Sequence, residues 1–256
     1  PEFLMKQILI MAGDGIGAEI MAQTQRVVQW FAQHRGVPMQ VREELFGIDA
    51  WKQHGSLMRD ESWQAVLHSD AILFGAIGSP AYEDIPLEHR QVDQLLRMRK
   101  ELDLFINLRP VKALPALEDA STLRPEVLRG TDMVLVRELS SGIYFGTPRG
   151  VQTQADGTRR VVNTMAYTEQ EIERIARAAF ELARTRRRQV CNVDKGNVLE
   201  NGAFWREVVV ALHRREFSDI ELSHLYVDNA AMQLVRNPRQ FDVMLTENLF
   251  GDILSD

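Results

Sequence analysis

Short apolar runs that alternate with helical patterns constrain the fold of this chain more than any other feature. Two of them, residues 6–11 (KQILIM) and 70–76 (DAILFGA), lead into glycine-containing turns. Further runs lie at 104–108, 132–136, 190–193, 220–227 and 241–246, with helical periodicity between most of them. Strands separated by helices favour parallel pairing, because a parallel connection needs a crossover of about a dozen residues. The pattern predicts an α/β fold with parallel or mixed sheets flanked by helices.

Three aspartates follow the last two of these runs. Asp252 and Asp256 stand four residues apart, so a helix would place both on one face, where two carboxylates repel each other. A hard divalent cation with oxygen ligands would relieve that repulsion. Alternatively, acids in a first helical turn simply complement the helix dipole. Asp228, at the expected end of the 220–227 strand, offers a third oxygen donor for a metal site.

Arginines also lie near the ends of expected strands. Arg109 and Arg137 stand where two strands should end, and Arg99 lies in a helix expected over 91–101. We expect Pro110 to stop the strand directly after Arg109. A single arginine is usually a surface or ion-pair residue, but guanidinium groups gathered at strand ends indicate a site for a carboxylate-bearing ligand.

Two further residues are possible proton-transfer groups. Tyr144 lies in the glycine-rich segment 140–150, and Lys195 follows the 190–193 strand. Taken alone, Lys195 is better explained as a surface cation. The Asp156-Gly157 pair predicts a β-hairpin, an exposed arm that could pair with a second subunit.

Gly13, Gly15 and Ala18 loosely match the glycine-rich loop of dinucleotide-binding folds. However, Asp14 inside that loop would direct a negative charge toward the phosphates. A tight turn between a strand and the following helix, whose apolar residues are Ile20, Val27, Val28 and Phe31, is the better interpretation.

Composition excludes several classes of protein. The chain is 45% hydrophobic and 26% charged with a net charge of -6, an ordinary globular balance without the clustered basic surface of a nucleic-acid-binding protein. No apolar run approaches the ~18 residues of a membrane span, and no signal peptide is evident. The single cysteine, Cys191, fits a reducing, cytoplasmic setting. Residues 1–4 resemble a cloning remnant.

Six motifs together resemble the isocitrate and isopropylmalate dehydrogenase family of metal-dependent β-decarboxylating enzymes. They are GDGIG at 13–17, LLRMRKELDLFINLRP at 95–110, VRELSSGIYFG at 136–146, VDKGNVLE at 193–200, YVDNAAMQLV at 226–235 and TENLFGDILSD at 246–256. The resemblance covers nearly the whole chain from Lys6. It implies a two-domain fold that is not a Rossmann fold.

The resemblance also implies residue roles. Arg99, Arg109 and Arg137 bind substrate carboxylates, Leu95 and Leu96 contact the substrate side chain, and Tyr144 and Lys195 transfer protons. Asp228, Asp252 and Asp256 bind Mg²⁺ or Mn²⁺, and Asp228 also borders the substrate. Gly78 and Ser79 bind NAD as part of a loop over residues 78–92 that borders the cofactor and the substrate, and Asn197 lies near the nicotinamide. Lys195 and Asp228 reach a neighbouring active site in a homodimer, so the sites are shared.

The function implied is NAD-dependent oxidative decarboxylation of a 3-substituted malate, with 3-isopropylmalate, of leucine biosynthesis, as the first candidate. Four features depart from the family pattern: Ala18 replaces a usual proline, Gln94 a usual glycine, Val92 a commonly acidic residue, and the loop over 78–90 has its own sequence. Tartrate, D-malate and homoisocitrate therefore remain alternative substrates. A metal- or anion-binding fragment without catalysis is the alternative of another class.

We expect residues 1–103 to form the first part of a cofactor-binding domain and 104–256 to form the substrate, metal and dimerisation domain. Asp256 is itself a ligand candidate and lies within an expected helix, whereas domain boundaries usually fall in exposed linkers. We therefore expect the remainder of the first domain, including the adenine-binding loop, to lie beyond this sequence.

Overall fold

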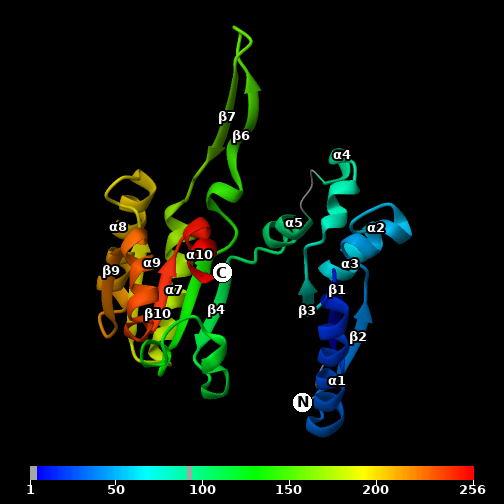
Figure 1. Ribbon diagram of the computed structural model, residues 1–256, viewed down its shortest axis with the longest axis horizontal. Helices are drawn as coiled ribbons and strands as arrows, with labels where there is room; N and C mark the ends of the chain where they lie inside the picture. The colour runs from blue at the N-terminus through cyan, green and yellow to red at the C-terminus, as the bar shows by residue number, and fades with distance from the viewer. Residues whose placement is uncertain (1–4, 91–93) are drawn as a thin grey trace. The chain divides into compact units, whose positions relative to one another are not determined.

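The structure is a computed structural model that describes residues 5–90 and 94–256. It contains two compact units, Pro1–Met98 and Arg99–Asp256, and the division falls inside helix α5 (Gln94–Glu101) (Figure 1). The expected domain roles of residues 1–103 and 104–256 remain predictions. In the described part of the chain, no helix combines the length and apolarity needed to cross a membrane.

The first unit contains a parallel sheet in the order β2-β1-β3, formed by β1 (Lys6–Gly13), β2 (Met39–Glu43) and β3 (Ala71–Ala76). Its helical segments are α1 (Gly17–Arg35), α2 (Ile48–His54), α3 (Asp60–Leu67), η1 (Pro80–Asp84) and α4 (Leu87–Arg90). The α/β prediction is confirmed. However, β3 is an edge strand with no fully buried residue, and not the doubly covered strand that its apolar run suggests.

Helix α1 packs differently from its sequence pattern. Ile20, Val27 and Phe31, expected on its core-facing side, are exposed, whereas Met21 is buried. The reason is geometric, because α1 packs mainly against β1 and β3 of this small sheet, so most of its surface stays uncovered by the described residues.

The turn between β1 and α1 is the tight strand-to-helix turn favoured by the sequence. A side chain at Gly13 would come within 2.0 Å of the Ala76 carbonyl oxygen, so the glycine permits close approach of β1 and β3. The buried Asp14 carboxylate accepts hydrogen bonds from the backbone N–H groups of Ile48 (2.8 Å) and Gly78 (3.0 Å) and from the Tyr82 hydroxyl (3.0 Å). Asp14 thus connects three segments, and its carboxylate accepts hydrogen bonds from within the fold.

The second unit contains a five-stranded sheet in the order β4-β5-β10-β8-β9. Its strands are β4 (Ile106–Lys112), β5 (Asp132–Glu138), β8 (Gln189–Asp194), β9 (Glu221–Tyr226) and β10 (Val243–Thr246). All neighbours are parallel except β4, which is antiparallel to β5. The carboxyl ends of β5, β10, β8 and β9 therefore meet at one edge of the sheet, where α/β proteins commonly bind ligands.

Alternate residues of these strands enter two separate cores. Val134, Val136, Val243 and Leu245 pack under α7 (Glu169–Arg184) and α8 (Glu200–Glu216), which form one layer. Met133, Leu135, Met244, Cys191 and Val193 face the opposite layer, with residues of α9 (Val227–Arg236) and α10 (Asn248–Ser255). The period of two in a strand produces this division. The predicted capping box of Thr168 and Glu171 begins α7.

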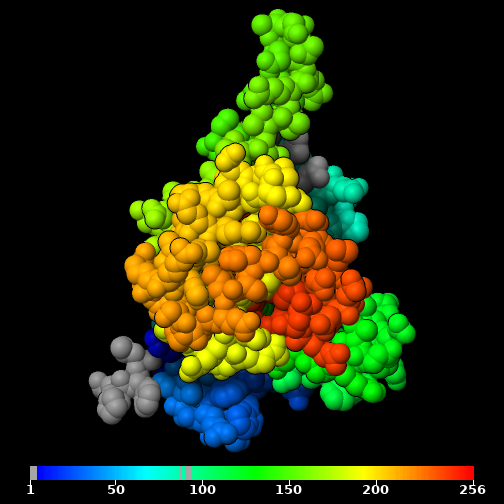
Figure 2. Space-filling view, turned by 90° about the vertical axis from the view of Figure 1, so that its left-hand side faces the viewer, coloured from blue at the N-terminus to red at the C-terminus, as the bar shows by residue number. Residues whose placement is uncertain are grey.

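The predicted hairpin is present as β6 (Gly146–Thr153) and β7 (Arg159–Thr164), antiparallel strands joined through the Asp156-Gly157 turn. Figure 2 shows it projecting from the second unit. Val151 and Val161 form a cross-strand pair and are both exposed. Shorter segments complete the unit: η2 (Pro115–Ala120), α6 (Pro125–Leu128), η3 (Gly142–Tyr144) and η4 (Pro238–Gln240).

Two local predictions were wrong. Pro110 does not end its strand, because β4 lies at the sheet edge and continues to Lys112; an edge strand can present a position without an N–H group to solvent. Asp228 lies in the first turn of α9, two residues beyond β9. Asn248 is the first residue of α10, and the Glu247 carboxylate caps this helix by accepting the N–H groups of Leu249 and Phe250.

Candidate active site

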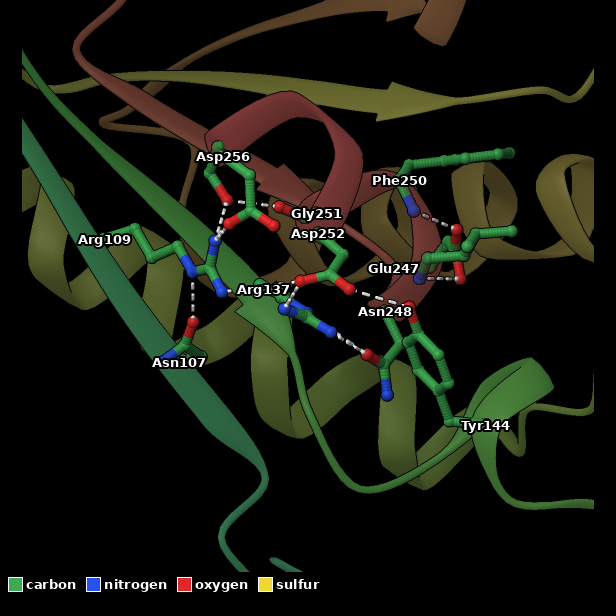
Figure 3. Close-up of polar contacts among 12 residues, drawn as sticks. Asn107, Arg109, Arg137, Tyr144, Glu247, Asn248, Phe250, Gly251, Asp252 and Asp256 are labelled. Atoms are coloured by element: carbon green, nitrogen blue, oxygen red, sulfur yellow. Dashed lines mark hydrogen bonds and ion pairs between the residues drawn. The ribbon is translucent and has the colours of Figure 1, made fainter. Parts of the chain in front are cut away.

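Arg109 and Arg137 lie on the same face of the second unit's sheet. Arg109 pairs with Leu135 across the β4–β5 ladder, and Arg137 pairs with Asn107. Directly opposed residues share a face, and Leu135 faces the layer that contains α9 and α10. Both guanidinium groups therefore point toward α10, although Arg109 lies inside its strand and not at the end (Figure 3).

The Arg137 side chain is almost completely buried, with 1% of its surface exposed. Its Nε and Nη2 atoms donate to the Asn248 side-chain oxygen at 3.1 and 2.8 Å, and Nη1 donates to the Asp252 carboxylate. The Asn248 side-chain nitrogen in turn donates to the Ser141 carbonyl at 3.0 Å. Asn248 thus fixes the plane of the guanidinium through Nε and Nη2, while Nη1 contacts Asp252.

Arg109 binds the end of α10. Its Nε donates to Asn107 at 2.7 Å, while Nη1 donates to the Ser255 hydroxyl at 2.8 Å and to the Asp256 carboxylate. Its Nη2 lies 3.4 Å from the same Asp252 oxygen that Arg137 contacts. The two aspartates, expected to share a helix face, therefore share one arginine, which neutralises their mutual repulsion.

The Tyr144 hydroxyl, on η3, donates to the other Asp252 oxygen at 2.7 Å. Burial, together with the Asp252 carboxylate, raises the pKa of Tyr144, so the phenol stays protonated at neutral pH. Burial alone would raise the pKa of Asp252, but the hydrogen bond from Tyr144 and the charge of Arg137 outweigh it and lower that pKa. Two arginines, a phenol and two carboxylates thus form one cluster.

Lys195 and Asp228 form a second cluster at the same sheet edge. Lys195 follows β8, Asp228 begins α9, and the lysine amine donates to the carboxylate at 2.6 Å. This hydrogen bond lowers the pKa of Asp228. Residues of the two clusters are not among each other's hydrogen-bond or ion-pair partners in the described parts of the chain.

The aspartates predicted as metal ligands are divided between these clusters. Within residues 5–90 and 94–256, no group of three or more His, Cys, Asp or Glu side chains could hold a metal ion. Asp252 and Asp256 supply carboxylate oxygens of the kind that Mg²⁺ and Mn²⁺ take, and both already contact a cationic group. The donor chemistry fits a divalent cation, although one chain brings only these two of the three residues together.

The remaining predicted residues lie on three segments: the turn after β3, helix α5, within which the two units divide, and the turn after β8. Gly78 and Ser79 follow β3; Gly78 is exposed, and Ser79 caps η1 by accepting the Ala81 N–H at 3.2 Å. The half-buried Leu95, Leu96 and Arg99 lie on α5. The exposed Asn197 follows Lys195. Val92, a position that departs from the family pattern, and residues 1–4 lie outside the described residues.

The sequence interpretation missed the buried polar groups behind the clusters. Besides Asn248, they include Glu138, Glu247 and Asp194, all buried. Burial raises the pKa of the Glu247 and Glu138 carboxyls. Each of the four stands within two residues of a strand end, and a polar residue directly after a buried apolar run was the available signal.

A mixed sheet that carries two arginines, two aspartates and a phenol in one cluster defines an α/β protein with a candidate site for an anionic ligand. A family model described as isocitrate/isopropylmalate dehydrogenase matches residues 7–256. The chain belongs to this family, as its motifs indicated.

Individual relatives and solved structures agree with this family assignment. The chain is 53% identical over 250 residues to the 3-isopropylmalate dehydrogenase of Gluconobacter oxydans and 52% identical over 251 residues to that of Paramagnetospirillum magneticum. Each match covers 98% of this chain and 68% of the relative. Among solved structures, isocitrate dehydrogenase from Methylococcus capsulatus superposes with a TM-score of 0.81 at 28% identity, covering 98% of this chain and 69% of that one. A β-decarboxylating dehydrogenase from Thermococcus kodakarensis gives 0.71 at 32%, covering 98% and 67%.

Proposed function

We propose that this protein catalyses the NAD-dependent oxidative decarboxylation of 3-isopropylmalate, a step of leucine biosynthesis. The observation that carries the proposal is the cluster of Arg109, Arg137, Tyr144 and Asp252, which combines groups for binding carboxylates with a proton donor. The names of relatives about half identical to the chain support the choice of substrate.

The two arginines bind the substrate through its carboxylates. Each guanidinium now contacts Asp252, and a substrate carboxylate can compete for the same donors, since arginine forks suit carboxylates in general. The buried setting of Arg137 strengthens such a contact, because a low local dielectric strengthens electrostatic attraction. Arg99, on α5, is the proposed third member of this clamp.

Asp252 and Asp256 are proposed to hold Mg²⁺ or Mn²⁺ together with Asp228 from a second copy of the chain. When bound, the metal would polarise the substrate's hydroxyl and carbonyl oxygens. NAD⁺ is proposed to lie against Gly78, Ser79 and Asn197 and would supply the hydride acceptor. The open space at Gly78, where a Cβ would meet no atom of the described residues within 4 Å, is compatible with close approach of a ligand to the backbone.

Proton transfer is assigned to Lys195 and Tyr144. Lys195 accepts the proton of the 2-hydroxyl, either directly or through Asp228, to which it is already hydrogen-bonded. Hydride then leaves C2, and the keto acid loses its β-carboxylate as CO₂. Tyr144, whose raised pKa keeps it protonated, donates a proton to the carbon that lost CO₂.

The proposed enzyme is a homodimer with shared active sites. Lys195 and Asp228 form a cluster of their own in one chain, which suits residues that complete the site of a neighbour. The projecting hairpin of β6 and β7, with its exposed Val151–Val161 pair, offers a surface for a second copy.

Steady-state kinetics of the full-length protein tests the proposed function. NADH formation is measured with 3-isopropylmalate, D-malate, tartrate and homoisocitrate at fixed Mg²⁺, and kcat/KM is compared. We expect 3-isopropylmalate to give the highest value. A higher value for another acid would reassign the substrate, and no NADH formation with any of them would favour a metal- or anion-binding role without catalysis.

A further inference from the structure

Three residues of the second unit link the two chain segments that carry Lys195 and Asp228. Asp194 is the last residue of β8 and precedes Lys195, and Tyr226 is the last residue of β9, two positions before Asp228. Arg206, on α8, contacts both. None of these three was predicted to have a role.

The Asp194 carboxylate is 2% exposed and accepts four hydrogen bonds. Arg206 donates to both of its oxygens at 2.8 Å, the Asn192 side chain donates at 2.7 Å, and the Gly196 backbone N–H donates at 2.9 Å. The last two donors lie on either side of Lys195. Asp194 therefore closes the turn from which the lysine side chain extends, and Arg206 neutralises its buried charge.

A second contact fixes the same turn independently. A side chain at Gly202, in the first turn of α8, would come within 2.7 Å of the Lys195 carbonyl carbon and of the Gly196 nitrogen. Helix α8 thus packs directly on the backbone of the Lys195 turn. Arg206 lies one turn further along the same helix, so the backbone that carries its side chain is held at a fixed position relative to Lys195.

The other side of the Arg206 guanidinium lies over the Tyr226 ring, 4.9 Å from the ring centroid. Tyr226 is the N-cap residue of α9, the helix whose first turn carries Asp228. Cations are attracted to aromatic faces at this distance. One guanidinium therefore contacts the β8 end through Asp194 and the β9 end through Tyr226.

We propose that Arg206 is a positioning residue that holds Lys195 and Asp228 in register with each other, through Asp194 on one side and Tyr226 on the other. In this proposal Arg206 acts through Asp194 and Tyr226 and not by contact with substrate or cofactor. The backbone ladder already pairs Asp194 with Tyr226 at the ends of β8 and β9, so the loss of Arg206 acts beyond the ladder. The Lys195 turn and the first turn of α9 then lose their shared side-chain contact, and the lysine amine and its carboxylate partner no longer meet in one geometry. The inference rests on the proposed catalytic role of Lys195.

Arg206→Gln tests this, with Arg184→Gln as the matched control. Arg184 also forms a two-atom contact with an aspartate, Asp219 (2.7 and 3.0 Å), and lies over an aromatic ring, Phe217 (4.6 Å), but at the other end of the unit. In the full-length protein we expect Arg206→Gln to lower kcat about tenfold or more, since small displacements of reacting groups are costly. The KM for 3-isopropylmalate should stay within about twofold, because the arginine clamp is untouched. Arg184→Gln should change neither constant.

A second readout does not depend on activity. Trace acylation by acetic anhydride, quantified by mass spectrometry, gives the reactivity of Lys195 relative to the exposed Lys112. An amine held against a carboxylate reacts slowly, so the ratio should rise in Arg206→Gln. We expect a rise of up to about fivefold, the size that loss of an exposed ion pair allows. The ratio should stay constant in Arg184→Gln. Tyr226→Leu removes only the ring contact and should give a smaller rise, which keeps the test valid if Arg206→Gln fails to fold.

The outcomes separate the two proposals. A wild-type protein without NAD-dependent activity refutes the proposed function, while the acylation ratio still decides the positioning role. Unchanged kcat and an unchanged ratio in folded Arg206→Gln and Tyr226→Leu would overturn the inference. A rise in KM with constant kcat would also overturn it, because it would place Arg206 in substrate binding.

Discussion

Replacing Asn248 with alanine should both destabilise the second unit and weaken substrate binding. The Arg137 side chain is 1% exposed, and the Asn248 oxygen accepts two of its N–H groups, from Nε at 3.1 Å and Nη2 at 2.8 Å. Leaving a buried donor unsatisfied costs about 1–3 kcal/mol. Two such donors predict a loss of roughly 2–4 kcal/mol in the free energy of unfolding, allowing for partial rearrangement.

The same change releases the guanidinium plane of Arg137. The contact from Nη1 to Asp252 and the looser contact with the Tyr144 ring, 5.7 Å from its centroid, would then orient it. A loss of about 1.4 kcal/mol in substrate binding corresponds to a tenfold rise in KM, which we expect as the minimum for 3-isopropylmalate. Asn248→Asp is the control, since it keeps an oxygen acceptor of the same shape for Arg137 while losing the donation to Ser141. It should lose less than half the stability lost by the alanine variant.

Urea unfolding followed by circular dichroism measures the stability, and steady-state NADH formation measures KM. The slope of the unfolding transition should stay constant, showing that the change lies in stability and not in the extent of unfolding. If Asn248→Ala unfolds within about 0.5 kcal/mol of the wild type and keeps its KM, the idea that Asn248 holds the arginine clamp is refuted.

Three further predictions follow from the same cluster and its surroundings. Asp252→Asn should weaken Mn²⁺ binding in calorimetry without unfolding the protein, and an unchanged titration would remove Asp252 from the metal site. Mixing Lys195→Ala chains with Arg109→Ala chains should restore activity once subunit exchange is shown, because one hybrid site contains both intact residues; no recovery would mean that each site is built from one chain. Burial raises the pKa of Glu247 above its ordinary 4.5, so its favourable contribution is complete below that pH and is lost as pH rises through the higher folded-state value. The free energy of unfolding of Glu247→Gln should therefore fall less than that of the wild type between pH 4 and pH 8, as measured by urea unfolding at each pH. If both proteins show the same dependence on pH, the assignment to Glu247 is contradicted.

The positions of strands and helices in the second unit followed closely from the sequence. Apolar runs such as 132–136 and 241–246 became or contain the strands β5 and β10, because a strand covered on both faces consists mainly of apolar side chains, with its buried polar residues near its ends. The capping box of Thr168 and Glu171 and the Asp156-Gly157 turn are local, so their geometry depends on a few neighbouring residues.

Local patterns failed where a distant segment decided the outcome. The edge position of β4 let Pro110 remain within the strand, and the small three-stranded sheet left Ile20, Val27 and Phe31 of α1 exposed. Neither sheet order nor the number of neighbours of a helix is encoded in a period of two or 3.6 residues.

The sequence by itself determined the α/β class, the family and the candidate residues, because each depends on residue types at short spacings. Only the tertiary structure decided their partners. It placed Arg109 against Asp252 and Asp256, and it paired Lys195 with Asp228 in a separate cluster. These contacts join residues from 33 to 147 positions apart. Lys195 meets Asp228 because the parallel strands β8 and β9 bring their carboxyl ends to one edge of the sheet, whereas Arg109 reaches α10 from the antiparallel strand β4, which pairs with β5.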